Sequence, residues 1–306
     1  MSMSMSSRDI LRSLSAEEKR ALTRRTNWHG LLHLFCHVAV AILLGVAVAY
    51  SSGLMQGTAM LCLGIVLVFF FPAMHEASHH TAFSSRWLNH SVTHLVGLLL
   101  FLPPRWFTLF HLAHHQHTHD KDRDPELSGG KPQTPAQYLV TMTGLPVWKA
   151  QITALLVNAA GRNCDEYVPD AQKAPIRYEA RFMILIYGLI LALSFFTQSL
   201  AALTFWLVPI MLGQPVLRAY LLVEHTGCEH SSDMMINSRT VLTSWPVRML
   251  AWNMPFHAEH HCFPAIPFHR LPQFHQVSRQ HIRNLSPGYT TFHKQYLSEI
   301  KRAPMQ

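Results

Sequence analysis

Histidine is concentrated in three short segments of this chain. The densest segment follows an apolar run and holds five histidines in nine residues, from His111 to His119. Imidazole is the commonest metal ligand in proteins and suits zinc, copper, iron and nickel. A hydrophobic core is not built from so many titratable rings, so we expect these segments to bind metal.

The spacing of the histidines within each segment is that of one face of a helix. In the densest segment, three rings stand at positions i, i+3 and i+4, and on a helix we expect all three to point towards one site. A second segment repeats this spacing, and the remaining one has an i, i+4 pair. The eight histidines with helical spacing are His75, His79, His111, His114, His115, His257, His260 and His261.

These eight rings are more than one metal ion can hold. A structural zinc ion takes four ligands, and a catalytic zinc ion takes three protein ligands plus water. We therefore expect two ions that share one site. A ninth candidate ligand is His225, which lies just after the end of an apolar run.

The composition indicates a membrane protein. The 306 residues are 49% hydrophobic and only 14% charged, whereas soluble proteins contain about 25% charged residues. A helix needs about 20 apolar residues to cross the hydrocarbon core of a bilayer. The apolar residues predict four spans in two hairpins, at residues 31–50, 54–73, 182–197 and 200–222.

The basic residues predict the orientation of the spans, because Lys and Arg stay on the cytoplasmic side in short loops. All 25 Lys and Arg residues lie outside the two short turns between paired spans. Both termini and the histidine segments would then face the cytoplasm, as expected for a bacterial inner-membrane protein. The net charge of +8 fits this bias, and no base-reading surface indicates a nucleic acid partner.

This topology divides the chain into a cytoplasmic N-terminal segment (1–26), a membrane domain (27–222) and a cytoplasmic C-terminal region (223–306). A cytoplasmic insertion at 74–181 carries the first two histidine segments. Within it, the apolar run at 91–104 is too short to cross the bilayer and predicts an interfacial or re-entrant segment. The expected fold is all-α, with four transmembrane helices and a cytoplasmic helical cap that holds the two metals.

The order of spans and histidine segments resembles that of the integral-membrane fatty acid desaturase and hydroxylase superfamily. The resemblance covers about residues 70–275 and rests on one His-x-x-x-His and two His-x-x-His-His patterns. It includes the acidic run Asp124-Pro-Glu126 and the stretch from Asn253 to Pro272. The resemblance implies a non-haem di-iron centre, ligated by these histidines, that uses O2 to abstract hydrogen from an unactivated C–H bond.

Several polar residues beside the histidines are candidates for positioning the ligands. A carboxylate there would accept a hydrogen bond from the second ring N–H and fix the tautomer of the ligand. The resemblance also implies that Asn253 reaches an iron through water. The candidates are Glu76, His80, Asp124, Glu224, Asn253 and Glu259.

Other histidines do not match the family spacing. For His117 and His119 we expect supporting or surface roles. A further stripe at His29, His33 and His37 lies along the start of the first span. It has no counterpart in the family motif, so we expect these rings to be structural or to line a substrate tunnel.

The expected activity is oxidation of a fatty acyl chain, as a free acid or a thioester, and desaturation is the favoured outcome. Hydroxylation, decarboxylation of a free fatty acid to a terminal alkene, and oxidation of a small non-lipid compound are the alternatives. The outcome depends on which hydrogen lies nearest the oxidant, which the sequence does not determine.

Electrons must come from outside, because the sequence has no flavin or NAD fingerprint and no fused cytochrome b5 motif. The expected donor is a ferredoxin or rubredoxin with an NAD(P)H reductase. A metal transporter or a haem protein is the competing class. A transporter would place its ligands near the middle of the bilayer, and haem needs one or two isolated histidines, so neither predicts rings gathered outside the spans.

Overall fold

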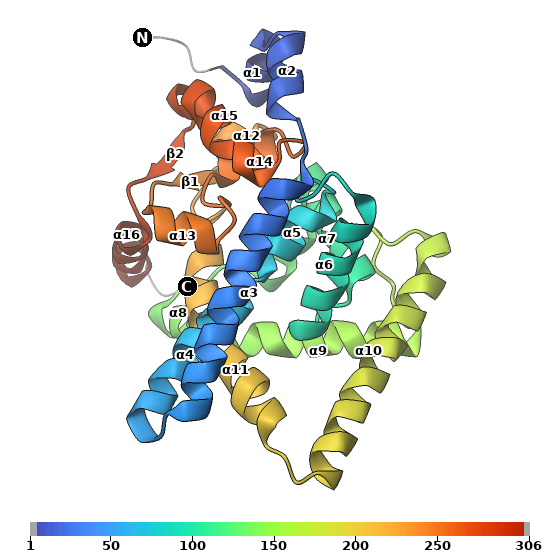
Figure 1. Ribbon diagram of the computed structural model, residues 1–306. Helices are drawn as coiled ribbons and strands as arrows, with labels where there is room; N and C mark the ends of the chain where they lie inside the picture. Colours follow the sequence, from blue (N-terminus) through green and yellow to red (C-terminus); the bar gives the residue numbers. More distant parts are fainter. Residues whose placement is uncertain (1–4, 303–306) are drawn as a thin grey trace.

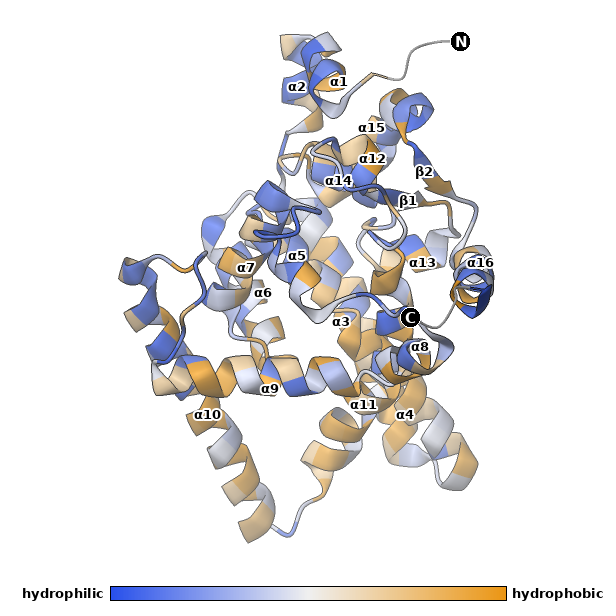
Figure 2. Ribbon diagram, turned by 180° about the vertical axis from the view of Figure 1, so that it is seen from behind, coloured by the Kyte–Doolittle hydropathy of each residue, from blue (hydrophilic) through white to orange (hydrophobic). Residues whose placement is uncertain are grey.

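The computed structural model describes residues 5–302, and most of these residues are helical. Four helical stretches of the described chain are long and apolar enough to cross a membrane, as predicted. They contain helices α3 (Asn27–Tyr50), α4 (Gly53–Val68), α10 (Asp170–Phe196) and α11 (Val208–Leu222). A short π-helix, Leu203–Leu207, leads into α11. Figure 2 shows hydrophobic residues along much of these helices.

The four long helices are not arranged as two closed hairpins. Helices α3 and α4 pack side by side, as expected for the first hairpin. Helices α10 and α11 are joined by a short turn but diverge from it (Figure 1). Helix α11 packs mainly against α4, and α10 packs against α9 (Leu145–Ala160). The second pair therefore forms an open V rather than a packed pair.

The segment between α4 and α10 is folded into short helices. The predicted short apolar run lies at the junction of two helices that are bent by 104°, which fits a segment that turns back rather than crosses. Helix α9 was not predicted, and it lies across the molecule in Figure 1 with several apolar side chains exposed. The elements are α5 (Phe71–Ser78), α6 (Arg86–Leu99), α7 (Pro104–His117), η1 (Pro125–Gly129), α8 (Pro135–Met142) and α9.

Short elements at both ends of the chain make up the rest of the fold, and one of them, α14 (His257–Cys262), carries three of the predicted ligands. Two three-residue strands pair in parallel, with Thr240 opposite Leu285, so the fold is not purely α; strands this short leave no alternating pattern in the sequence. The elements are α1 (Ser7–Ser13), α2 (Ala16–Leu22), α12 (Met234–Asn237), β1 (Arg239–Val241), α13 (Trp245–Leu250), α14 (His257–Cys262), η3 (Phe268–Arg270), α15 (Leu271–Ser278), η4 (Arg279–His281), β2 (Asn284–Ser286) and α16 (Tyr289–Arg302).

Helices α4 and α11 touch through their backbones. A Cβ atom built on Gly64 would lie 1.8 Å from the carbonyl oxygen of Pro209, and one on Gly213 would lie 2.2 Å from the carbonyl carbon of Gly64. Small residues allow such close approach between membrane helices. Because α5 follows α4 and His225 follows α11, this contact sets the distance between two of the histidine-bearing segments.

Replacing Gly64 by alanine should therefore lower the stability of the folded protein. Alanine is the better helix former, so any loss of stability must come from the contact, where overpacking costs about 1–3 kcal/mol or more. We expect Gly64→Ala to lower the melting temperature in detergent and the amount of bound metal. Gly57→Ala on the same helix is the control, because nothing lies within 4 Å of its Cβ position. Equal effects of the two substitutions would contradict this role of the contact.

Candidate metal centre

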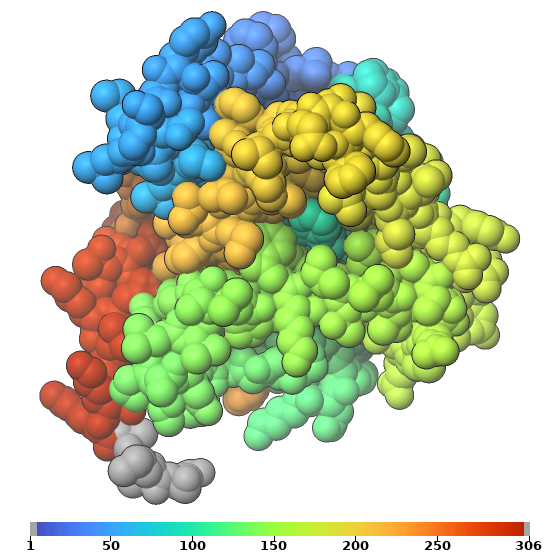
Figure 3. Space-filling model, turned by 90° about the horizontal axis from the view of Figure 1, so that it is seen from below, coloured from blue at the N-terminus to red at the C-terminus, as the bar shows by residue number. Residues whose placement is uncertain are grey.

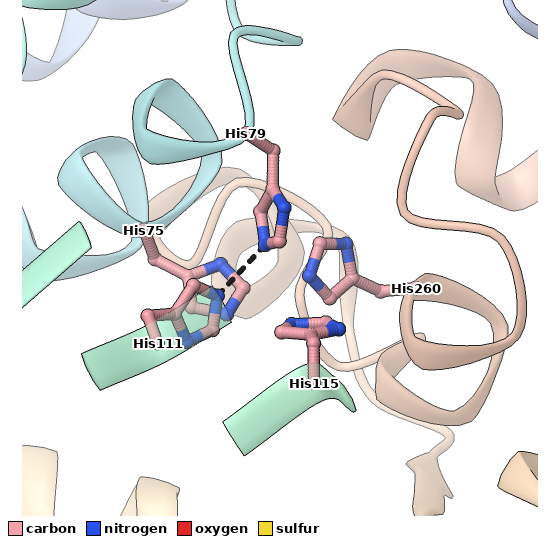
Figure 4. Close-up of side chains that lie close together, drawn as sticks. All are labelled: His75, His79, His111, His115 and His260. Carbon is pink, nitrogen blue, oxygen red and sulfur yellow. Dashed lines mark hydrogen bonds between the residues drawn. The ribbon is translucent and has the colours of Figure 1, made fainter. Parts of the chain in front are cut away.

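Eight of the nine predicted ligands form two neighbouring groups. Within each group, one ring nitrogen of every histidine lies within 4.8 Å of the others. Figure 4 shows the rings of the larger group turned towards one another. The five-histidine group contains His75, His79, His111, His115 and His260, and the three-histidine group contains His114, His225 and His261.

The ninth predicted ligand, His257, lies at the edge of the three-histidine group. Its Nε2 atom is 2.9 Å from the Nε2 atom of His225. Its ring centroid is 4.5 Å from that of His261 and 6.3 Å from that of His75 in the other group. His257 therefore extends the three-histidine group.

Helices α7 and α14 each contribute to both groups. His115 joins the five-histidine group, whereas its neighbour His114 joins the other, and His260 and His261 are divided in the same way. Neighbouring residues on a helix point about 100° apart. The three rings of α7 therefore point to two adjacent positions rather than to the single point expected from their spacing.

The five-histidine group has the properties of a metal site. The Nε2 atoms of His79 and His111 lie 2.7 Å apart (Figure 4). Both ring nitrogens of His115 and of His260 are buried and have no hydrogen-bond partner. A buried polar atom without a partner costs about 1–3 kcal/mol. A bound metal ion would satisfy one of the two nitrogens of each ring, so the residues fit a metal.

The rings of the three-histidine group are held by hydrogen bonds to the nitrogen that faces away from the centre of the group. Each Nδ1 atom has a hydrogen-bond partner, which leaves the Nε2 atom free to face the centre of the group, as in many metal sites. The partners are the carboxylate of Asp124 for His114 at 2.9 Å, the carbonyl of Asn237 for His225 at 3.1 Å and the hydroxyl of Thr118 for His261 at 3.2 Å.

Asp124 lies where a positioning carboxylate was expected, and it has three partners. Besides the ring of His114, it accepts hydrogen bonds from the backbone N–H groups of His119 at 2.8 Å and Glu126 at 3.0 Å. It is 5% exposed. One buried carboxylate thus orients a histidine of α7 and begins the 3-10 helix η1.

Two other predicted carboxylates lie near the ligands but beyond hydrogen-bond distance. An oxygen of Glu224 is 3.5 Å from Nδ1 of His257. An oxygen of Glu76 is 3.9 Å from Nδ1 of His260, while its other oxygen accepts a hydrogen bond from the backbone of Phe268 at 2.9 Å. Both side chains thus lie close to the histidines without orienting a ring by a hydrogen bond.

The remaining positioning candidates lie elsewhere. Glu259 accepts a hydrogen bond from the ring of His275 instead of from a ligand. The side-chain amide of Asn253 donates to the carbonyl oxygen of Phe268 at 3.2 Å. The ring of His80 packs against that of His90 in α6 and belongs to neither group. Sequence neighbours of ligands need not face the metal, because adjacent residues leave the backbone in different directions.

Sequence reasoning missed Glu126 as a site residue. One of its carboxylate oxygens lies 3.3 Å from Nε2 of His114, the nitrogen that faces the three-histidine group. The acidic run was noticed only as part of the family pattern. Its position directly after Asp124 and Pro125 was the available signal, because that order is typical of a capped helical turn.

The histidine stripe of the first span is structural. Nε2 of His33 lies 2.5 Å from the carbonyl oxygen of Met249, and Nε2 of His37 lies 2.8 Å from a carbonyl oxygen of α4. The ring of His29 stacks on that of His269 at 4.2 Å. These contacts fix α3 against α4 and the C-terminal region.

Burial keeps most of the candidate ligand rings neutral, whereas the carboxylates of Glu126 and Asp124 outweigh burial at His114 and raise its pKa. Burial lowers the pKa of His79 and His225 to about 3, with neighbouring histidines adding to the effect. Burial and the surrounding rings also lower the pKa of His257, His260 and His261 well below the usual value. A neutral imidazole is the form that binds a metal ion.

Comparisons with known proteins agree with this geometry. Residues 51–293 match the family model described as fatty acid desaturase. The chain is 25% identical over 235 residues to an sn-1 oleoyl-lipid 12-desaturase of a Picosynechococcus species, covering 71% of this chain and 67% of the relative. It is 26% identical over 230 residues to sphingolipid delta(4)-desaturase DES1 of Xenopus tropicalis, covering 72% and 65%. The match thus spans about two thirds of each relative.

Two histidines of α7 provide a matched test of metal binding. We expect His115→Ala to reduce the metal content of the purified protein, because this ring lies within the five-histidine group. His117→Ala removes a ring from the same helix that belongs to neither group, so its metal content should stay at the level of the unmodified chain. Metal analysis by mass spectrometry decides, and a similar content in both variants would argue against the site.

The metal-free protein should lose stability as the pH falls. The pKa of His79 and His225 is about 3 in the folded chain and about 6.5 in an unfolded one. Between these values the unfolded chain binds protons that the folded chain does not, which costs about 1.4 kcal/mol per pH unit for each ring. We expect the melting temperature to fall from pH 7.5 to 5, and less steeply in His79→Gln. An equal melting temperature at both pH values would contradict the burial of neutral rings.

Proposed function

This chain belongs to the fatty acid desaturase family, and we propose that it is a membrane-bound, O2-dependent di-iron oxidase that desaturates a fatty acyl chain. The observation that carries the proposal is the convergence of histidines from α5, α7, α14 and the segment after α11 in two adjacent groups. Two irons bound there would supply the reduction of O2 and the abstraction of hydrogen from a C–H bond.

The residues around the groups would hold the ions and keep bulk water away. Every residue of α14 is buried, and so is every residue of α5 except Phe71. Asp124, Asn237 and Thr118 keep three rings in the orientation that presents Nε2. Preorganised ligands in a water-poor site favour binding of metal and protect reactive species from side reactions.

An apolar wall beside the five-histidine group supports an acyl substrate. The ring of Phe107 stacks on that of His111, with centroids 5.6 Å apart. Phe71 packs against Phe107 at 5.5 Å and lies 6.4 Å from the ring of His75. Phe107 is buried, so a hydrocarbon chain that approaches these histidines would meet aromatic surface rather than water.

The membrane face offers a route towards this wall. Figure 3, which looks at the molecule from below, shows a hollow bounded by α9, α10 and α11, with the teal segment around α6 at its base. At the junction of α6 and α7, the ring of Phe101 packs against Trp148, Tyr187 and Trp206. We propose that an acyl chain enters from the bilayer through this hollow, past these aromatic side chains.

The electron donor and the orientation are parts of the same proposal. A ferredoxin or rubredoxin with an NAD(P)H reductase would deliver electrons to the side of the membrane that carries the histidine groups. We assign this side to the cytoplasm, because the basic residues lie there and Lys and Arg favour that side. An acidic redox protein would suit the net charge of +8.

Reconstitution tests the proposal. The purified chain, supplied with a ferredoxin, its reductase and NADPH in air, should convert an acyl-CoA or a free fatty acid into a product two mass units lighter. It should also contain close to two irons and show no haem absorption band. The control is His260→Ala, which removes a ring of the five-histidine group and should abolish the product.

The products also separate the alternatives. A gain of one oxygen would indicate hydroxylation, and loss of CO2 with a terminal alkene would indicate decarboxylation. Consumption of a small amine or ether but of no acyl compound would overturn the lipid substrate. A haem spectrum, or the absence of iron from an otherwise folded protein, would overturn the di-iron oxidase.

A further inference from the structure

The two histidine groups are unequal. One has five rings, and the other has three with His257 at its edge. On the far side of His114, the smaller group is bordered by the carboxylate of Glu126. A carboxylate is a common ligand of iron and other divalent metals, so its position needs an explanation.

The carboxylate faces the nitrogen that a metal would use. Nδ1 of His114 is engaged by Asp124 at 2.9 Å, so the ring presents Nε2 to the group. That Nε2 atom lies 3.1 Å from Nε2 of His225 and 3.3 Å from Oε2 of Glu126. Ligand atoms on neighbouring corners of one ion are about 3 Å apart when each lies about 2.1 Å from it, and both distances are close to this value.

Glu126 is held in place by its surroundings. Its backbone N–H donates to Asp124 in the first turn of η1, where Pro125 fixes the backbone. Its second oxygen, Oε1, accepts from the Lys131 ammonium at 2.9 Å. The loop of Lys131 is fixed in turn, because Tyr296 donates its hydroxyl proton to the carbonyl of Pro132. One oxygen is thus anchored and the other is left facing the histidines.

The charge balance favours a carboxylate at this position. Neutral rings alone would leave two divalent ions uncompensated in a buried site, and a buried unpaired charge is costly. A glutamate is ionised at neutral pH in its ordinary state. Glu126, whose side chain is 35% exposed, would add a ligand and a negative charge that Lys131 offsets only in part.

We infer that Glu126 binds the ion of the three-histidine group through Oε2, so that this ion has histidine and carboxylate ligands while the other has histidines only. The inference rests on the proposed function for the presence of two ions, but it concerns the ligand set alone. The competing explanation is that Glu126 serves only to neutralise Lys131.

The test is metal binding to Glu126→Gln, which keeps the shape of the side chain and removes its charge. The apo protein in detergent is titrated with Co(II) alone, and the bound metal is counted after gel filtration. We expect the unmodified chain to bind two ions. In the variant, one ion should bind normally and the other about 100-fold or more weakly. Loss of a residue that only orients a ligand lowers metal affinity by about 10- to 100-fold, and loss of a ligand should cost at least as much. Glu229→Gln is the control, because this exposed carboxylate pairs with the exposed Arg283.

A double substitution separates the two explanations. If Glu126 only neutralises Lys131, removing both charges in Lys131→Met/Glu126→Gln should restore the second ion. If Glu126 is a ligand, the double variant should be as defective as Glu126→Gln, and Lys131→Met alone should be less so. Melting temperatures of the apo proteins verify that all variants fold.

The outcomes also distinguish this inference from the proposed function. Two Co(II) ions bound equally well by Glu126→Gln and by the unmodified chain would overturn the ligand assignment, even if the enzyme is an oxidase. A chain that binds two ions, loses one in Glu126→Gln and oxidises no acyl compound would support the assignment and contradict the oxidase. Recovery of the second ion in the double variant would overturn the assignment.

Discussion

The backbone contact between α4 and α11 positions much of the site. At Gly64 and Gly213 no side chain separates the two helices, so their separation is set by main-chain atoms rather than by adaptable packing. Helix α5 and its C-cap continue from α4 with two rings of the five-histidine group, and the chain beyond α11 brings His225 to the other group. A close backbone contact between two apolar helices thus sets the relative positions of the histidines that follow these helices.

The sequence predicts the spans better than their packing. Runs such as residues 54–73 are visible because a bilayer demands continuous apolar stretches, whereas lipid-facing and protein-facing sides have similar compositions. The open V of α10 and α11 therefore could not be predicted. Helix α9 escaped detection because it is shorter than a span and is set off by Pro146 and Gly161. Its apolar side chains gave no run long enough to stand out.

The candidate site could be predicted from residue type and spacing, but not in its internal arrangement. Histidines are conspicuous at this density, and their order along the chain gave all nine candidates. The division of His114 and His115 between two groups depends on where α5, α14 and the end of α11 lie around α7. Thr118 and the carbonyl of Asn237 gave no signal, because a hydroxyl or a backbone oxygen becomes a partner only through the fold.

The divided histidine pairs have a consequence for how the centre assembles. Since α7 and α14 each send rings to both groups, an ion bound in the first group would immobilise helices that also carry rings of the second. If two ions bind, the first would meet part of the ordering cost of the second, which favours cooperative binding. A chain with one ion should accordingly be scarce at intermediate metal supply, and newly inserted protein would pass from empty to fully loaded almost in one step.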